Sequence, residues 1–163
     1  MISRRVFIGT LTGGLLAAPL AAAAQQAGKV PRIGFLGPSS RSDTSPWVDG
    51  FRQGLRELGW VEGKNIVIEY RWAEGRSERV SDLAAELVRL KVDVILAAST
   101  SVAVAAKNST STIPIVMATG GDPVGIGLVA TLARPGGNVT GLSYSVGVET
   151  VGKGLELLKE IVP

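Results

Sequence analysis

One glycine-rich stretch contains the carboxylate with the clearest chemical potential in this sequence. Residues 118–141, ATGGDPVGIGLVATLARPGGNVTG, follow a short apolar run and contain a single acidic residue, Asp122. An acid at this position can accept hydrogen bonds from backbone N–H groups at the start of a helix, with Pro123 as the first helical residue. It can also pair with the amine of a ligand, and the two roles do not exclude each other.

The same stretch matches a dinucleotide-binding pattern, G-x-G-x-x-A, at Gly125, Gly127 and Ala130, with Glu149 downstream as a ribose contact. That motif requires its glycines in the turn between a strand and a helix. Here Asp122 and Pro123 already begin the predicted helix, so both glycines would fall inside its first turns. The sequence therefore argues against a nucleotide site.

Two residue types with catalytic and metal-binding roles are missing. The chain has no histidine and no cysteine. Their absence removes the usual hydrolytic triads, a thiol nucleophile, disulfides and the commonest metal ligand. The acidic residues that remain show no spacing typical of a metal site, and no nucleophile has a paired base. We therefore predict a protein that is not an enzyme and that needs no cofactor and no metal.

Apolar runs alternate with amphipathic segments along the chain. Strands are predicted at residues 30–37, 65–72, 92–98, 113–118 and 138–143, and helices at 46–60, 77–90, 100–109 and 122–133. Such alternation on short connections indicates right-handed βαβ units. The predicted fold class is α/β, an open doubly wound parallel sheet in three α/β/α layers, with the first strand near the centre.

In a sheet of this kind, ligands bind beyond the carboxyl ends of the strands. The segments that follow the predicted strands include GPSSRSDTS at 37–45, ASTS at 98–101, TGGD at 119–122 and SYSVG at 143–147. Several are rich in serine and threonine. Their hydroxyls and backbone N–H groups can bind a small polar ligand.

The N-terminus has the pattern of an export signal. Residues 1–24 begin with SRRVFIG, continue without charge, and end in PLAAAA before Gln25. This order of basic, apolar and small residues is typical of a cleaved signal peptide, and Arg4 with Arg5 fits its twin-arginine form. Cleavage after Ala24 would lower the net charge from +3 to about +1. The remaining Lys and Arg residues are scattered, so we expect no nucleic-acid partner.

Three long segments resemble a known family. They are GFLG with FRQGLRELGWVEGKNIVIEYRWAEG, LAAELVRLKVDVILAAST, and IPIVMATGGDPVGIGLVATLARPGGNVTGLS; the most specific parts are ELGWVEGKNI and DPVGIGLVATLARPGGNVTG. They are similar to the periplasmic substrate-binding components of ABC transporters, in the group with tryptophan- and tyrosine-binding lipoproteins. The resemblance implies a two-lobed α/β protein of the type I periplasmic-binding class, which closes on a small solute and delivers it to a membrane permease.

The resemblance also implies which residues bind the solute. It places Ser39 and Ser40 after the first strand, Ser99, Thr100 and Ser101 after the third, and Asp122 after the fourth on the ligand side. The turn at Ser99, Thr100 and Ser101 would suit a carboxylate, and Asp122 an amino group. Helix capping is the alternative role for the residues at 99–101. Trp47 and Trp72 could stack on a ligand or belong to the core.

The sequence departs from this family in two respects. It has no lipid-modified cysteine, which predicts a soluble periplasmic form, and it stops at Pro163, where relatives continue into a second lobe. We therefore expect a signal at 1–24, one lobe at 25–148, and a helix at 149–163 leading toward a second lobe. Three alternatives for this one-lobe form are open: a truncated gene product, a fragment of a split gene, and a lobe that pairs with a separate second-lobe chain. A periplasmic sensory or interaction domain of the same fold, without tight solute binding, is the alternative function.

Overall fold

The computed structural model describes residues 29–43, 45–144 and 159. The predicted signal at 1–24 lies outside the described residues. So do the predicted C-terminal helix at 149–163, apart from Lys159, and the ribose candidate Glu149.

Five parallel strands form one sheet in the order β2-β1-β3-β4-β5. The strands are β1 (Arg32–Gly37), β2 (Val67–Trp72), β3 (Val94–Ala97), β4 (Ile115–Met117) and β5 (Val139–Gly141). All four neighbouring pairs are parallel. This confirms the predicted α/β class and all five predicted strands, and β1 lies between β2 and β3 as expected.

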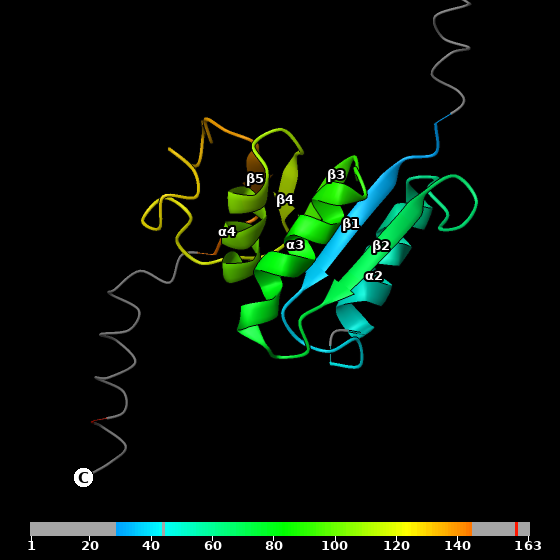
Figure 1. Ribbon diagram of the computed structural model, residues 1–163, viewed down its shortest axis with the longest axis horizontal. Coiled ribbons are helices and arrows are strands. Elements are labelled where there is room, and N and C mark those ends of the chain that lie inside the picture. Colours follow the sequence, from blue (N-terminus) through cyan, green and yellow to red (C-terminus); the bar gives the residue numbers. More distant parts are fainter. Residues whose placement is uncertain (1–28, 44, 145–158, 160–163) are drawn as a thin grey trace, which may run out of the picture. The chain divides into compact units, whose positions relative to one another are not determined.

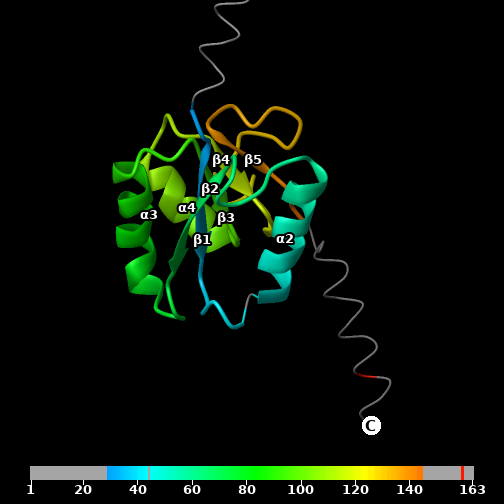
Figure 2. The same ribbon diagram turned by 90° about the vertical axis from the view of Figure 1, so that its right-hand side faces the viewer.

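Helices lie on both faces of the sheet (Figures 1 and 2). Helix α2 (Ser45–Glu57) lies on one face, and α3 (Val80–Arg89) and α4 (Thr100–Ser109) lie on the other; the short 3₁₀ helix η1 (Ser77–Arg79) leads into α3. The apolar spacing of α3 explains its position, because Val80, Leu83, Ala84 and Leu87 are all buried. Among the described residues, no helix has both the length and the apolar character needed to cross a bilayer.

The apolar residues of α2 at helical spacing are only in part buried. Phe51 and Leu55 are partly buried against the sheet, as the spacing predicts. Trp47 and Leu58, which continue the same helical spacing in the sequence, are exposed, and Val48 is buried. The helix packs through the middle of its apolar face and leaves both ends of the stripe in solvent.

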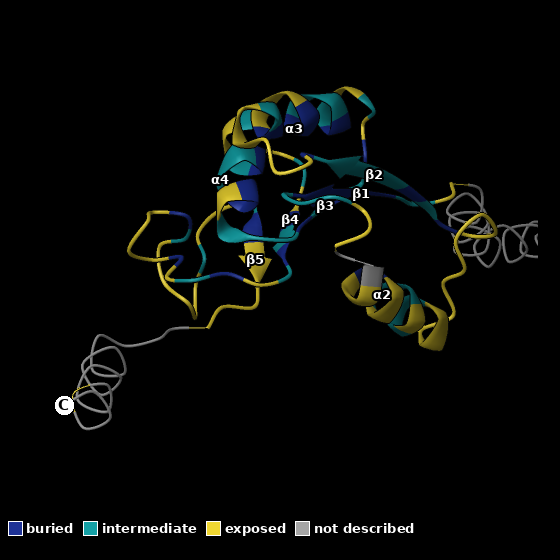
Figure 3. Cartoon of the chain, turned by 90° about the horizontal axis from the view of Figure 1, so that it is seen from below, coloured by how far each residue is buried: buried dark blue, intermediate teal, exposed yellow. Residues whose placement is uncertain are grey.

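The two faces of the sheet are buried to different extents (Figure 3). On the α3 and α4 face, a large cluster of buried side chains joins both helices to the strands; it includes Leu36, Leu87, Ile95, Val102, Ile115 and Val139. On the α2 face, the cluster has three buried members, Phe35, Val48 and Ile68. The main hydrophobic core therefore lies on the α3 and α4 side.

The prediction of a helix at 122–133 is wrong, because residues 123–127 form turns and no helix follows in residues 128–144. Gly127 has a φ of 71°, which interrupts a right-handed helix. Two glycines and several β-branched residues give the segment a weak helix propensity. The N–H groups of Leu128 and Val129 instead both donate to the carbonyl of Pro123. Leu128 is buried in the main core, and Lys107 Nζ donates to the carbonyls of Gly127 and Leu128 at 2.8 and 2.9 Å.

Candidate functional site

The candidate site lies at the carboxyl edge of the sheet, where β1 and β3 end side by side. The chain leaves β1 toward α2 on one face, and it leaves β3 toward α4 on the other face. The strand order reverses at this point, which is where open α/β sheets bind ligands. Ser39 and Ser40 follow β1, the turn at Ser99–Ser101 follows β3, and Asp122 follows β4. The topology therefore brings every predicted site residue to one edge.

The turn after β3 forms the N-terminus of α4. Ser99 has an extended backbone and is the N-cap, and its hydroxyl accepts from the N–H of Val102 at 3.4 Å. The hydroxyl of Ser101 is exposed and lies 3.2 Å from that of Ser99. Helix N-termini carry partial positive charge and attract anions. Capping and anion binding are thus both compatible with this turn, and the structure shows the capping role of Ser99.

One hydrogen bond connects this turn to the turn after β4. The N–H of Gly121 donates to Thr100 Oγ1 at 2.9 Å, between residues 21 positions apart in sequence. Thr100 is partly buried and Gly121 directly precedes Asp122. The carbonyl of the neighbouring Gly120 accepts from the N–H of Tyr144 at 2.9 Å. These bonds connect the loops after β3, β4 and β5 at one edge of the sheet.

Asp122 is exposed at this edge, and its Oδ1 accepts from the N–H of Gly125 at 2.8 Å. The sequence predicted a helix N-cap here, whereas the carboxylate closes a turn that does not continue as a helix. The dinucleotide interpretation of Gly125, Gly127 and Ala130 loses its structural basis for the same reason. That motif binds the pyrophosphate at a helix N-terminus, and the part of the chain described after this turn, residues 128–144, has no helix.

The loop after β1 contains two further predicted site residues, Ser39 and Ser40. Ser40 Oγ donates to Asp43 Oδ2 at 2.7 Å and accepts from the N–H of Asp43 at 3.3 Å, so its hydroxyl is engaged within its own loop. Ser39 is partly buried. The structure thus places both serines at the predicted edge, and the two hydrogen bonds between Ser40 and Asp43 lie within the loop.

The sequence did not indicate an apolar groove that begins at this edge and continues over the α2 face of the sheet. It has a volume of about 770 Å³ and is lined by both strand and helix residues, among them Trp47, Phe51, Leu96, Val116 and Leu142. Trp47 belongs to this groove and is 79% exposed, whereas Trp72 packs in the sheet with its ring centre 4.8 Å from that of Phe35. Of the two tryptophans considered as ligand contacts, Trp47 is exposed and Trp72 is partly buried.

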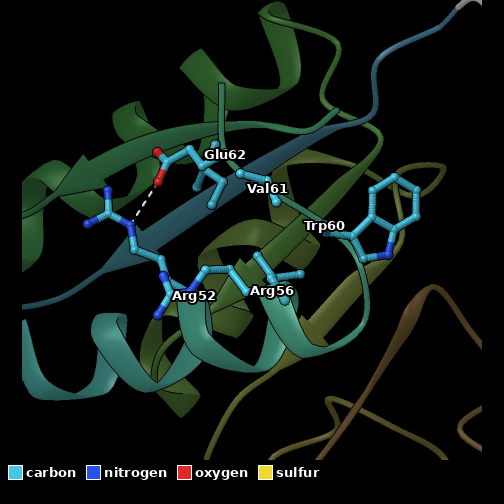
Figure 4. A pocket seen from close by; sticks show the side chains of 7 residues that line it. Arg52, Arg56, Trp60, Val61 and Glu62 are labelled. Carbon is cyan, nitrogen blue, oxygen red and sulfur yellow. Dashed lines mark hydrogen bonds and ion pairs between the residues drawn. The ribbon is translucent and has the colours of Figure 1, made fainter. Parts of the chain in front are cut away.

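A second hollow, of about 270 Å³, lies beside the C-terminal end of α2 and includes Trp60 (Figure 4). Arg52 Nε donates to Glu62 Oε2 at 2.8 Å and to the hydroxyl of Tyr70 at 3.0 Å. The bond with Glu62 raises the pKa of Arg52, and burial raises the pKa of Tyr70. This hollow is near the amino ends of the strands, away from the predicted site. Its Arg52 already forms an ion pair with Glu62.

Known proteins are similar to this chain in both sequence and fold. The family model described as ABC transporter substrate binding protein matches residues 38–163. The tyrosine-binding protein of Clostridioides difficile (strain R20291) is 40% identical over 114 residues, which are 70% of this chain and 32% of that protein. Family members are substrate-binding proteins rather than enzymes, which agrees with the prediction that the chain is not an enzyme.

Three solved structures are similar to this lobe. A conserved domain protein of Vibrio cholerae O1 biovar El Tor has a TM-score of 0.72 and 36% identity over 83% of this chain and 45% of its own. An ABC domain from Streptococcus pneumonia, solved in complex with L-Trp, has a TM-score of 0.65 and 31% identity over 71% of this chain and 39% of its own. The ligand-free, open structure of a substrate-binding protein with adhesive properties from Clostridium difficile has a TM-score of 0.68 and 37% identity, and covers 82% of this chain and 44% of its own.

The chain spans less than half of the length of each of these relatives. The family match begins at residue 38, directly after β1, so it includes strands β2 to β5 and the loops at the carboxyl edge of the sheet. Over most of its length, therefore, this chain belongs to the family of ABC transporter substrate-binding proteins.

Proposed function

We propose that this chain is the solute-binding lobe of an ABC uptake system and binds a small amino-acid-like solute at the carboxyl edge of its sheet. The observation that supports this most directly is the hydrogen bond from Gly121 N–H to Thr100 Oγ1. It joins a helix N-terminus, which suits a carboxylate, to a turn whose carboxylate suits an amine. An α-amino acid carries both groups on one carbon atom.

The roles of the individual residues follow from their chemistry. Ser101 and the backbone N–H groups at the start of α4 donate to the solute carboxylate, and Ser99 orients that turn through its bond to Val102. Asp122 pairs with the solute amine. Ser39 and Ser40 flank the site from β1 and make the weaker contribution, because Ser40 already bonds within its loop.

Substrate-binding proteins of this family work outside the cytoplasm. We propose that residues 1–24 direct export to the periplasm, with cleavage after Ala24, and that the partner is an ABC permease in the inner membrane. A second lobe would supply the facing wall of the site. Without that wall, much of the solute stays in contact with water, so we expect weak binding by this lobe alone.

The test is the substitution Asp122→Asn, with L-tyrosine and L-tryptophan as probes because relatives of this chain are described as binding them. Asn keeps the acceptor for the N–H of Gly125 but loses the negative charge. A lost amine contact should cost about 1.5–3 kcal/mol, or roughly a tenfold to hundredfold loss of affinity. The affinities are measured by NMR titration, which detects weak binding.

Glu57→Gln is the matched control, since it makes the same acid-to-amide change at the exposed end of α2, far from the carboxyl edge. Its affinity should equal that of the parent chain. Equal affinity of Asp122→Asn and the parent, with both proteins folded, would show that Asp122 does not bind the amine and would refute the site as proposed.

A further inference from the structure

Lys107 in the last turn of α4 bonds to the segment that contains Asp122. Its Nζ donates to the carbonyls of Gly127 and Leu128 at 2.8 and 2.9 Å, across 20 and 21 positions of sequence. No ion pair joins Lys107 to a carboxylate in the part of the chain that the structure describes. Hydrogen bonds from a charged donor are stronger than those between neutral groups. The two carbonyl bonds therefore fasten the turns after Asp122 to α4.

The segment that begins at Asp122 is a single hydrogen-bonded unit. Asp122 Oδ1 accepts from the N–H of Gly125 at 2.8 Å. The carbonyl of Pro123 accepts from the N–H groups of Leu128 and Val129 at 2.8 and 3.0 Å. Pro123 and Leu128 are buried, whereas Asp122 is exposed. Because these bonds connect the last residues of the unit to its first ones, a shift at Leu128 also changes the position of Asp122.

Helix α4 binds this unit at two points on one face. Near the N-terminus of the helix, Thr100 Oγ1 accepts from the N–H of Gly121 at 2.9 Å, and in the last turn Lys107 bonds to the two carbonyls. Thr100 and Lys107 are about two helical turns apart, so they share a face and lie roughly 10 Å apart along the axis. Asp122 lies between the two bonded points in sequence. A segment held at two points of one helix cannot rotate about either of them.

The proposed solute binding requires such a fixed position. The solute carboxylate would bind at the N-terminus of α4, and Asp122 would bind the amine. Both groups of an α-amino acid are on one carbon atom, so their two binding groups in the protein must keep a constant separation. The bond of Thr100 holds the chain before Asp122, and the bonds of Lys107 hold the chain after it.

We propose that Lys107 is a positioning residue, which holds the turn of Asp122 against α4 so that its carboxylate stays where the amine of an α-amino acid requires it. This inference rests on the proposed function, because the role of Asp122 is part of that function. Lys107 acts through the turn and does not contact the solute.

Hydrogen exchange of the free protein tests whether Lys107 holds the turn. Lys107→Met keeps an unbranched apolar side chain and removes both bonds. Exchange of the N–H groups of Gly125 and Leu128 should become about tenfold faster, because the loss is that of a hydrogen bond to a charged group. The N–H of Ile95, which donates to a neighbouring segment inside the main core, should exchange at the same rate as in the parent chain. Lys107→Arg, which keeps the charge and the donors, should restore slow exchange.

Lys64→Met is the matched control. It makes the same change at an exposed lysine in the turn that follows α2. Exchange in the turn of Asp122 should be the same as in the parent chain. If Lys107→Met does not fold, the same measurements use Lys107→Gln, which keeps a donor and loses the charge.

Solute binding tests whether the position of the turn matters for the amine. NMR titrations compare L-tryptophan with indole-3-propionate, which lacks the amine. Lys107→Met should weaken binding of L-tryptophan about tenfold and should leave binding of indole-3-propionate unchanged. Added to Asp122→Asn, it should cause no further loss of affinity for L-tryptophan, because the contact that it positions is already absent.

Three results would overturn the proposal. They are unchanged exchange at Gly125 in Lys107→Met, equally accelerated exchange at Ile95, and an equal loss of affinity for the two ligands. The second and third would mean that Lys107 stabilises the lobe as a whole. A parent chain that binds neither ligand would refute the proposed function, and exchange at Gly125 would still decide whether Lys107 holds the turn.

Discussion

The hydroxyl of Thr100 connects two turns that meet at the candidate site. It accepts from the N–H of Gly121 at 2.9 Å, and both residues are partly buried. A buried N–H without a partner costs more than the hydrogen bond itself contributes, because the group has lost its water. The bond therefore helps to hold the N-terminus of α4 and Asp122 in a fixed relative position.

We predict that Thr100→Val destabilises the lobe by about 1–3 kcal/mol, since valine fills the same space but leaves the N–H of Gly121 without its acceptor. Urea unfolding measures this loss. Thr112→Val makes the same change at an exposed position and should alter stability by less than about 0.5 kcal/mol. Equal stabilities of the two variants would mean that the bond between Thr100 and Gly121 contributes nothing.

The positions of the site residues were predictable from the sequence, but their bonding was not. The ends of strands are visible in the apolar pattern, so Ser99–Ser101 and Asp122 could be assigned to one edge. Which hydroxyl bonds to the protein depends on the direction of individual N–H groups. Thr100 bonds to Gly121 and Ser40 bonds to Asp43, and sequence spacing gives no signal for the first of these.

At the scale of elements, the strands and three helices were predicted correctly and the helix at 122–133 was not. Strands β1 to β5 have apolar side chains that the packed sheet requires, so their pattern is strong. The segment after Asp122 has Pro123 and apolar residues at suitable positions, which suggested a helix. The backbone preferences of Gly125 and Gly127 outweighed that pattern, and Leu128 enters the core from a turn.

Gly141 allows β5 to lie close to β4. Gly141 in β5 has a φ of 140°, and an added Cβ would overlap the backbone carbonyl oxygen of Met117 in β4. Gly141→Ala should therefore force β5 away from β4 and destabilise the lobe by about 2–4 kcal/mol. Thermal unfolding measures the effect. Gly137→Ala is the matched control, because open space surrounds that position and its φ is not positive.

If Gly141→Ala and Gly137→Ala have the same melting temperature, the close approach of β5 to Met117 is not a constraint on the fold. A decrease confined to Gly141→Ala confirms that β5 belongs to the folded sheet.

At the scale of the whole molecule, the alternation of strands and helices was enough to predict the sheet and the place of β1 in it. The incomplete cover of the α2 face was not predictable, because α2 has a regular apolar stripe in the sequence. In the structure only the middle of that stripe contacts the sheet, and Trp47 remains exposed. Burial depends on how many helices share a face, which local periodicity does not reveal.

A residue-resolved NMR titration of the chain with L-tryptophan tests whether the carboxyl edge of the sheet binds an amino-acid-like solute. If the solute binds there, the largest changes in amide chemical shift occur at Ser99, Thr100, Ser101, Gly121 and Asp122. Indole-3-propionate, which lacks the amine, and tryptamine, which lacks the carboxylate, should each produce smaller changes. Changes centred on Trp60 in the second hollow, or no changes at high L-tryptophan concentration, would contradict binding at the carboxyl edge.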